Sequence, residues 1–356
     1  ETIRRTYKAS LLAAATLCCP SLALAQTAPD IEPDNGAEAA PREEAIVVVG
    51  KLTDSALDRD DIEITQANDL GDLFRRTPSV SVGGAIGIAE KIYVRGLEDA
   101  QLNISIDGAQ IQGTLFHHVG RVSVEPELLE RVDIQTGAGE ATSGFGAIGG
   151  AIRFRTRDAV DLLEPGRNVG GIARAGWFSN DGYKLSGTAY GRIAGDVGII
   201  ASYVHQNRDP YEDGDGNEVR SAYKNSEARL DAAWKADNGF YIKGLVSRQE
   251  ERDVKYAGSG MDAPKTDTDI MRLELGSPVA NGNWNLLAWQ AAVDHIMDNF
   301  SLRESMMKML TDSETETRGL RLTLDQSPDA RTDWAIGADV ETNNWHAERF
   351  GGANLD

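Results

Sequence analysis

Hydrophobic and polar residues alternate through most of the second half of the chain. After Gly166, apolar side chains occupy every other position, as in the runs 197–203, 287–293 and 334–340, and Ser, Thr, Arg, Glu, Asp, Gln or Gly lie between them. Successive side chains of a strand point to opposite faces, so this alternation predicts half-buried β-strands. Short turns and longer acidic loops separate the runs, which is typical of a transmembrane β-barrel.

A soluble β-sandwich would show the same period, so the alternation alone leaves two architectures open. Basic residues, an apolar run and an Ala-x-Ala site predict a secretory signal peptide over residues 1–25. Cys18 and Cys19 lie inside it, so the mature chain would have no disulfide. The loop 208–222 is longer than a hairpin needs, and no later stretch is apolar enough for a membrane helix. Together these observations favour the barrel.

Two short segments follow the signal peptide. Residues 26–43 are rich in Pro, Ala, Glu, Asp and Gln, which predicts a flexible leader. Residues 44–50, EAIVVVG, form a β-prone run. Such a run can add as a strand to the sheet edge of a partner, or it can be the first strand of the next domain. Composition alone leaves both readings open. The net charge of −20 argues against nucleic acid as a partner.

Residues 51–165 read as one small α+β domain. We expect a short helix over 69–76, which Asn68 caps and Pro78 ends. Strands are expected over 80–82, 91–95, 103–107, 131–135 and 151–155, with a turn at Asp107-Gly108 and a short helix over 127–130. This alternation over a short stretch is enough for one compact domain.

Glycine is concentrated between the last two of these strands, at Gly137, Gly139, Gly144, Gly146, Gly149 and Gly150. Residues 144–149 match G-x-G-x-x-G, the dinucleotide fingerprint, which requires a helix directly after it. Here an alternating run with Arg153, Arg155 and Arg157 follows instead. We therefore reject nucleotide binding and expect glycines that pack backbone closely against backbone.

Several of these segments, in this order, resemble the TonB-dependent outer-membrane receptors. The matching stretches are 44–50 (EAIVVVG), 72–80 (DLFRRTPSV), 92–96 (IYVRG), 104–108 (ISIDG) and 126–152, which ends in GFGAIGGAI. Two positions depart from the family pattern: Thr136-Gly137-Ala138 replaces Arg-Gly-Pro, and Phe145 replaces a tyrosine. The resemblance is close over about 44–158 and extends to the strand region only in style.

The resemblance implies an α+β plug domain (51–165) followed by antiparallel transmembrane β-barrel strands (166–356). Family barrels have 22 strands, and we expect this chain to contain only the first eight or nine. Residues 44–50 would be the TonB box, in which Glu44, Ile46, Val47, Val48 and Val49 pair with TonB. Arg95, Glu130 and Arg131 would make plug–barrel contacts that can be broken; ordinary surface charge is the alternative for the two arginines.

The implied function is active transport across the outer membrane of a Gram-negative cell, among outer-membrane lipid, with no enzymatic activity and no resident cofactor. The expected cargo is an iron chelate, most simply a ferric siderophore. Haem or a transition metal such as zinc or copper is the alternative, and a non-transporting barrel adhesin is the alternative of another class. His117 and His118 lie where the family has apical plug loops, and adjacent imidazoles can ligate haem iron or a metal. The alternative for this pair is solvent exposure without a ligand.

Overall fold

The computed structural model describes residues 54–84, 86–110, 125–137, 144, 146–329 and 331–352. The predicted signal peptide, the predicted leader, the predicted TonB box with Glu44 and Ile46 to Val49, and the His117-His118 pair lie outside these ranges. The described residues belong to one compact unit that begins at Gly50.

The plug domain contains short helices and strands in alternation. Its elements are β1 (Asp54–Leu57), α1 (Arg59–Thr65), α2 (Leu70–Phe74), β2 (Val80–Gly83), η1 (Gly87–Ala89), β3 (Lys91–Val94), β4 (Leu97–Glu98), η2 (Asp99–Gln101), β5 (Asn103–Ile106), β6 (Ala109–Gln110), η3 (Pro126–Leu128), β7 (Leu129–Thr136), β8 (Gly150–Thr156) and α3 (Ala159–Leu162). The predicted α+β class is confirmed, and each predicted strand is present within a residue or two of its expected limits.

Two local predictions differ from the structure. Asp69, not Asn68, caps α2, because its carboxylate accepts a hydrogen bond from the Asp72 amide, and the helix ends at Phe74. The helix expected over 127–130 is wrong: η3 is a 3₁₀ turn, and β7 begins at Leu129. Leu129 already pairs with Thr156 of β8, and this pairing leaves no room for a further helical turn.

Five strands form the main plug sheet in the order β1-β7-β8-β5-β6. All neighbours are antiparallel except β5 and β8, which are parallel. Alternate side chains of β7 and β8 enter the core, where Val132, Ile152 and Phe154 are fully buried and Phe74 of α2 packs edge-on against Phe154. The domain is therefore organised around the strands that flank the glycine-rich stretch.

Gly150, the first residue of β8, shows why glycine is needed there. Its φ of +138° is rarely adopted by residues with a side chain, and an added Cβ would lie 2.2 Å from the Gln135 carbonyl oxygen of β7. That oxygen belongs to the backbone of the paired strand and cannot move aside. The expected use of glycine for close backbone packing is confirmed at this position.

We therefore expect Gly150→Ala to destabilise the plug domain by about 3 kcal/mol, from backbone strain and overpacking together. The measurement is the calorimetric unfolding transition of the purified full-length receptor. Gly83→Ala in β2 is the matched control, because its Cβ would meet only a Tyr93 ring carbon at 3.9 Å. Equal transitions for both variants would contradict the packing argument.

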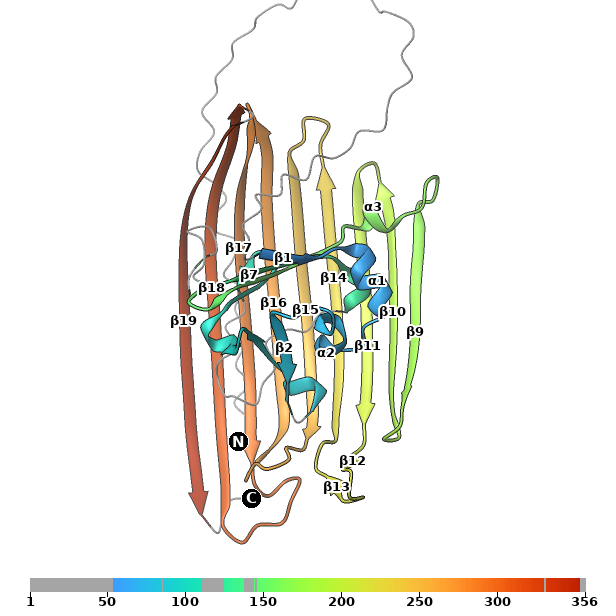
Figure 1. The fold of residues 1–356 in the computed structure, drawn as a ribbon, viewed down its shortest axis with the longest axis vertical. Helices are drawn as coiled ribbons and strands as arrows, with labels where there is room; N and C mark the ends of the chain where they lie inside the picture. The colour runs from blue at the N-terminus through green and yellow to red at the C-terminus, as the bar shows by residue number, and fades with distance from the viewer. Residues whose placement is uncertain are drawn as a thin grey trace, which may run out of the picture. The chain divides into compact units, whose positions relative to one another are not determined.

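Nine long antiparallel strands lie side by side after the plug domain (Figure 1). They are β9 (Val169–Phe178), β10 (Gly182–Ala194), β11 (Val197–Arg208), β14 (Tyr223–Lys235), β15 (Tyr241–Val254), β16 (Asp262–Val279), β17 (Gly282–Asp298), β18 (Lys308–Asp329) and β19 (Thr332–Gly352). The small hairpin β12 (Tyr211–Glu212) and β13 (Glu218–Val219) lies in the loop before β14. We call these nine strands the barrel sheet.

The two ends of the barrel sheet differ. At one end, which we call the turn end, neighbouring strands are joined by short segments such as 195–196 and 280–281. At the other, the loop end, the connections include 209–222, 255–261 and 299–307. Outer-membrane barrels have short periplasmic turns and longer extracellular loops. The loop end therefore corresponds to the cell exterior and the turn end to the periplasm.

The barrel sheet has an apolar outer face. Leu230, Met271, Leu273, Leu320 and Leu322 are all about half exposed there. Among the described strands β9 and β19 form the two edges and do not pair with each other, so these strands do not close a barrel. No helix among the described residues has the length and apolar character needed to cross a membrane.

Candidate functional site

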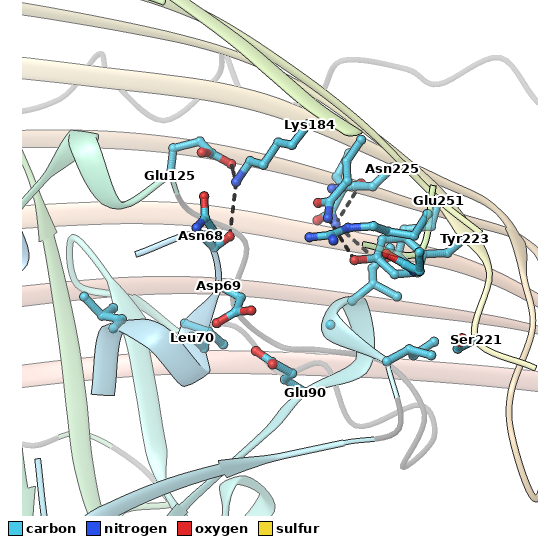
Figure 2. A pocket seen from close by; sticks show the side chains of 18 of the residues that line it. Asn68, Asp69, Leu70, Glu90, Glu125, Lys184, Ser221, Tyr223, Asn225 and Glu251 are labelled. Atoms are coloured by element: carbon cyan, nitrogen blue, oxygen red, sulfur yellow. Dashed lines mark hydrogen bonds and ion pairs between the residues drawn. The ribbon is translucent and has the colours of Figure 1, made fainter. Parts of the chain in front are cut away.

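A cavity of about 290 Å³ lies between the plug domain and the barrel sheet near the loop end (Figure 2). We call it the loop-end cavity. On the plug side it is lined by the start of α2, by η1 and by the residues before η3; on the barrel side by β10, β11, β14 and β15. Its labelled polar side chains come from both parts: Asn68, Asp69, Glu90, Glu125, Lys184, Ser221, Tyr223, Asn225 and Glu251.

An ion pair connects the two walls of this cavity. The Lys184 ammonium of β10 lies 2.8 Å from the Glu125 carboxylate and donates to the Asn68 carbonyl oxygen at 3.3 Å. Next to it, Arg174 of β9 donates to Glu127 at 2.7 Å. The plug residues that flank the cavity are thus held by cations of the first two barrel strands.

Glu90 is a plug residue of this cavity whose carboxyl has a strongly raised pKa. Partial burial, and after it the nearby Asp69 carboxylate, raise the pKa of its carboxyl to about 7. Hydrogen bonds from the Gly71 and Leu70 amides act in the opposite direction. Glu90 therefore gains or loses its proton near neutral pH.

The raised pKa predicts that Glu90 makes the plug less stable as the pH rises. The folded state binds this proton more tightly than the unfolded chain does, so the stabilisation is fully present below about pH 4.5 and is lost as the pH rises through about 7. Because solvent screens part of the interaction, we expect an effect on the order of 1 kcal/mol. Glu90→Gln should unfold at a higher temperature than the wild type at pH 8 and at a similar one at pH 5. A difference of the same size at both pH values would contradict the assignment.

A second contact region lies nearer the turn end, around the Asp107-Gly108 turn. Asp107 accepts hydrogen bonds from the Thr156 amide and hydroxyl, both at 2.7 Å, within the plug. Its carboxylate also lies 3.8 Å from Arg229 and 3.6 Å from Arg272 of the barrel sheet. Asp158 of the plug pairs with Lys243 of β15 at 2.7 Å.

The three residues predicted to contact the barrel lie elsewhere. Arg131 pairs with Asp133, and Glu130 lies 3.7 Å from Arg157, so both ion pairs are within the plug domain. Arg95 is exposed in the turn between β3 and β4, with a left-handed φ of 50°. Their role against the barrel stays a prediction, while other residues make the plug's contacts with these nine strands.

The residues that do join the two parts were missed because the resemblance contains no barrel motif. One signal was available: Lys184, Arg229, Arg272 and Arg321 occupy the strand positions that alternate with the exposed apolar residues. A cation at such a position faces away from the lipid side. Within the described part of the chain, His, Cys, Asp and Glu form no group able to hold a metal ion.

The comparisons with known proteins agree with this arrangement. The family model "TonB-dependent Receptor Plug Domain" matches residues 52–151. Heme transporter BhuA of Brucella ovis is 38% identical over 160 residues, which are 45% of this chain and 24% of that protein. TonB-dependent heme receptor A of Haemophilus influenzae is 29% identical over 158 residues, 42% of this chain and 21% of that protein.

Solved structures share the fold over a larger part of the chain. Copper transporter OprC superposes with a TM-score of 0.73 at 24% identity and covers 83% of this chain and 47% of that one. The FrpB iron transporter from Neisseria meningitidis gives 0.66 at 21% identity, with 83% and 47% covered. The chain spans about a quarter of the length of the curated relatives and about half of these solved chains.

Proposed function

Because this chain belongs to the TonB-dependent outer-membrane receptors, we propose that it is the plug domain and first barrel strands of a receptor that imports haem. In this proposal haem binds from outside, the TonB box pairs with TonB, and the energised inner-membrane complex moves the plug. The cargo then passes to the periplasm.

The observation that carries the choice of haem is the likeness to haem transporters. Curated relatives that match this chain are named for haem or hemin, and the family model of the plug domain matches residues 52–151. This likeness favours the alternative stated for the sequence over the ferric siderophore expected first. The matched plug domain also argues against the non-transporting adhesin.

The loop-end cavity supports the proposal with the two kinds of surface that haem needs. Ile86 and Ile88 of the plug and Tyr223 of the barrel line it and belong to one apolar cluster. Arg208 supplies positive charge in the same wall, as does Lys184, which is paired with Glu125; the carboxylates of Asp69, Glu90 and Glu251 also line it. Haem is a flat apolar ring with two carboxylates, so an apolar wall with nearby cations suits its recognition.

Growth of a strain that lacks the full-length gene tests the proposal. We expect the strain to lose growth on haem as sole iron source and to regain it with the wild-type gene. Growth on a panel of ferric siderophores, and under zinc or copper limitation, should be unchanged. Loss of growth on one siderophore with normal growth on haem would overturn haem and restore the first expectation.

A further inference from the structure

Three arginines of the barrel sheet surround the Asp107-Gly108 turn of the plug. Arg229 of β14 and Arg272 of β16 approach the Asp107 carboxylate, Arg272 also donates to the Asp107 carbonyl oxygen at 2.9 Å, and Arg321 of β18 donates to that of Gly108 at 3.4 Å. Their side chains are 6%, 7% and 17% exposed. We call these three residues the arginine ladder.

The ladder runs diagonally across alternate strands toward the turn end. Arg229 is in register with Ser247 and through it with Ile270, and Arg272 lies two residues beyond Ile270. Arg272 is in register with Trp289 and Gly319, and Arg321 again lies two residues further along β18. Since the turn end corresponds to the periplasm, the ladder descends from the plug toward the side where cargo leaves.

Each ladder arginine also has a carboxylate within the barrel sheet. Arg229 donates to Asp231 with both contacts at 2.7 Å, Arg272 lies 3.3 Å from Glu274, and Arg321 lies 4.0 Å from Asp339. Asp107 in turn retains its two hydrogen bonds to Thr156 inside the plug. Removing one partner of a buried ion pair is costly because it leaves a bare charge. When the Asp107-Gly108 turn moves away from the ladder, the arginines keep their barrel carboxylates and Asp107 keeps its bonds to Thr156. No charge is left without a partner, so this contact is suited to repeated release.

A cavity of about 420 Å³ lies directly beside the ladder. Six cations and four carboxylates line it, and two of the cations, Arg155 and Arg157, also pair with the plug carboxylates Asp133 and Glu130 outside this wall. The cations are Arg153, Arg155, Arg157, Lys243, Arg272 and Arg321, and the carboxylates are Asp107, Asp158, Asp231 and Glu274. The Nε donor of Arg272 is buried without a hydrogen-bond acceptor among the described residues. This wall can accept an additional carboxylate.

We propose that the arginine ladder is a carboxylate site, which the plug's own Asp107 fills at rest and a carboxylate of the cargo fills during transport. The proposal rests on the proposed function, because haem brings two propionate carboxylates. When the plug turn withdraws, the ladder exchanges one carboxylate for another and guides the cargo toward the turn end. A guanidinium is suited to this exchange because its fork of donors binds carboxylates in pairs of hydrogen bonds.

The test compares two cargoes and three variants of the full-length receptor in the gene-deleted strain. The cargoes are haem and haem dimethyl ester, which lacks free carboxylates. The variants are Arg272→Gln/Arg321→Gln, Asp107→Asn, and Arg318→Gln as the matched control. Arg318 lies three residues from Arg321 on the same strand, points to the opposite face, and pairs with Glu316. Uptake is divided by the amount bound at the surface of non-energised cells, so that changes at the outer site cancel.

We expect the double arginine variant to take up haem about tenfold more slowly and the ester at the wild-type rate, as the loss of a charge-assisted hydrogen bond implies. Asp107→Asn should retain haem uptake, because the ladder stays intact, and Arg318→Gln should match the wild type. Arg272→Lys/Arg321→Lys keeps the positive charges, so its rate of haem uptake should lie between those of the double Gln variant and the wild type. This comparison separates the loss of charge from faulty assembly of the receptor.

The opposite pattern would overturn the proposal. If Asp107→Asn and the double arginine variant lose uptake equally, and equally for haem and its ester, the ladder only anchors the plug. Normal haem uptake by the double arginine variant would also show that the ladder does not bind a carboxylate of the cargo. A wild-type receptor that neither binds nor imports haem would instead refute the proposed function. The growth panel would then identify the cargo, and uptake of that cargo by the same variants would test the ladder.

Discussion

Val48→Pro is expected to abolish haem uptake and to leave haem binding at the cell surface unchanged. Strand addition joins a segment to a partner's sheet through main-chain hydrogen bonds. Proline has no N–H to donate and fixes its own φ, so one proline in the middle of Ile46 to Val49 should prevent the pairing. Binding should persist because the change leaves the described residues that line the two cavities unaltered.

Val48→Thr is the matched control, because threonine keeps the backbone donor and is equally suited to a strand. It should support normal uptake, measured as labelled haem accumulated by energised cells, with binding measured on cells without energy. Normal uptake by Val48→Pro would show that the coupling segment lies elsewhere. It would favour the other reading of residues 44–50, a first strand of the plug domain.

The structure indicates how a pull on this segment would reach the plug. The first described strand, β1, begins at Asp54, four residues after Gly50, and β7 is its single partner among the described strands. Its four residue pairs run from Asp54 with Gln135 to Leu57 with Val132. An edge strand with one partner is the part of a sheet that separates most readily. Force applied to the segment would therefore act first on β1 and then on β7, whose last residue, Thr136, is paired with Gly150.

The sequence predicted the strands well where one face is apolar and poorly where both faces are polar. In β18 the alternation of Leu320, Leu322 and Leu324 marks one half, but the strand begins twelve residues earlier, at Lys308. The segment from Thr311 to Thr317 is polar throughout and is held by backbone pairing with β17 and β19 on either side. Hydrophobic alternation cannot reveal strand that extends beyond the apolar part of the membrane.

The short elements β1, α1 and α3 were missed for a related reason. α1 and α3 begin at capping boxes built on Asp58 and Asp158, which lie in acidic stretches that read equally well as loops. The contacts between the plug and the barrel sheet could not be predicted from the sequence, for a different reason. Asp107 and Arg272 are 165 positions apart, and only the register of the barrel sheet brings them together. The sequence did show that Arg272 lies between Met271 and Leu273, which are exposed, so that its side chain points to the opposite face of the strand.

The last prediction concerns His117 and His118, which lie in the sequence between β6 and η3. The chain leaves β6 at Gln110 and re-enters the described structure at Glu125, which lines the loop-end cavity. The connection is therefore attached at one end to the wall of the proposed haem site. Neutral imidazole is a common ligand of haem iron, whereas the iron of a ferric siderophore already has a filled coordination sphere.

Changing both histidines to Ala should weaken haem binding by at least about 100-fold, because it removes the iron–nitrogen bond rather than only the groups that orient it. The measurement is an absorbance titration of purified full-length receptor with haem, next to titrations with zinc, copper and ferric siderophores. His346→Ala is the matched control, since His346 is exposed on β19 and lies 3.4 Å from Glu348 of the same strand. Each single variant should show a smaller loss than the double variant if both rings can reach the iron.

Unchanged affinity of the double variant for haem and for every metal would mean that the pair is solvent-exposed without a ligand. The cations and apolar residues of the loop-end cavity would then have to account for recognition of haem without a bond from this pair to iron.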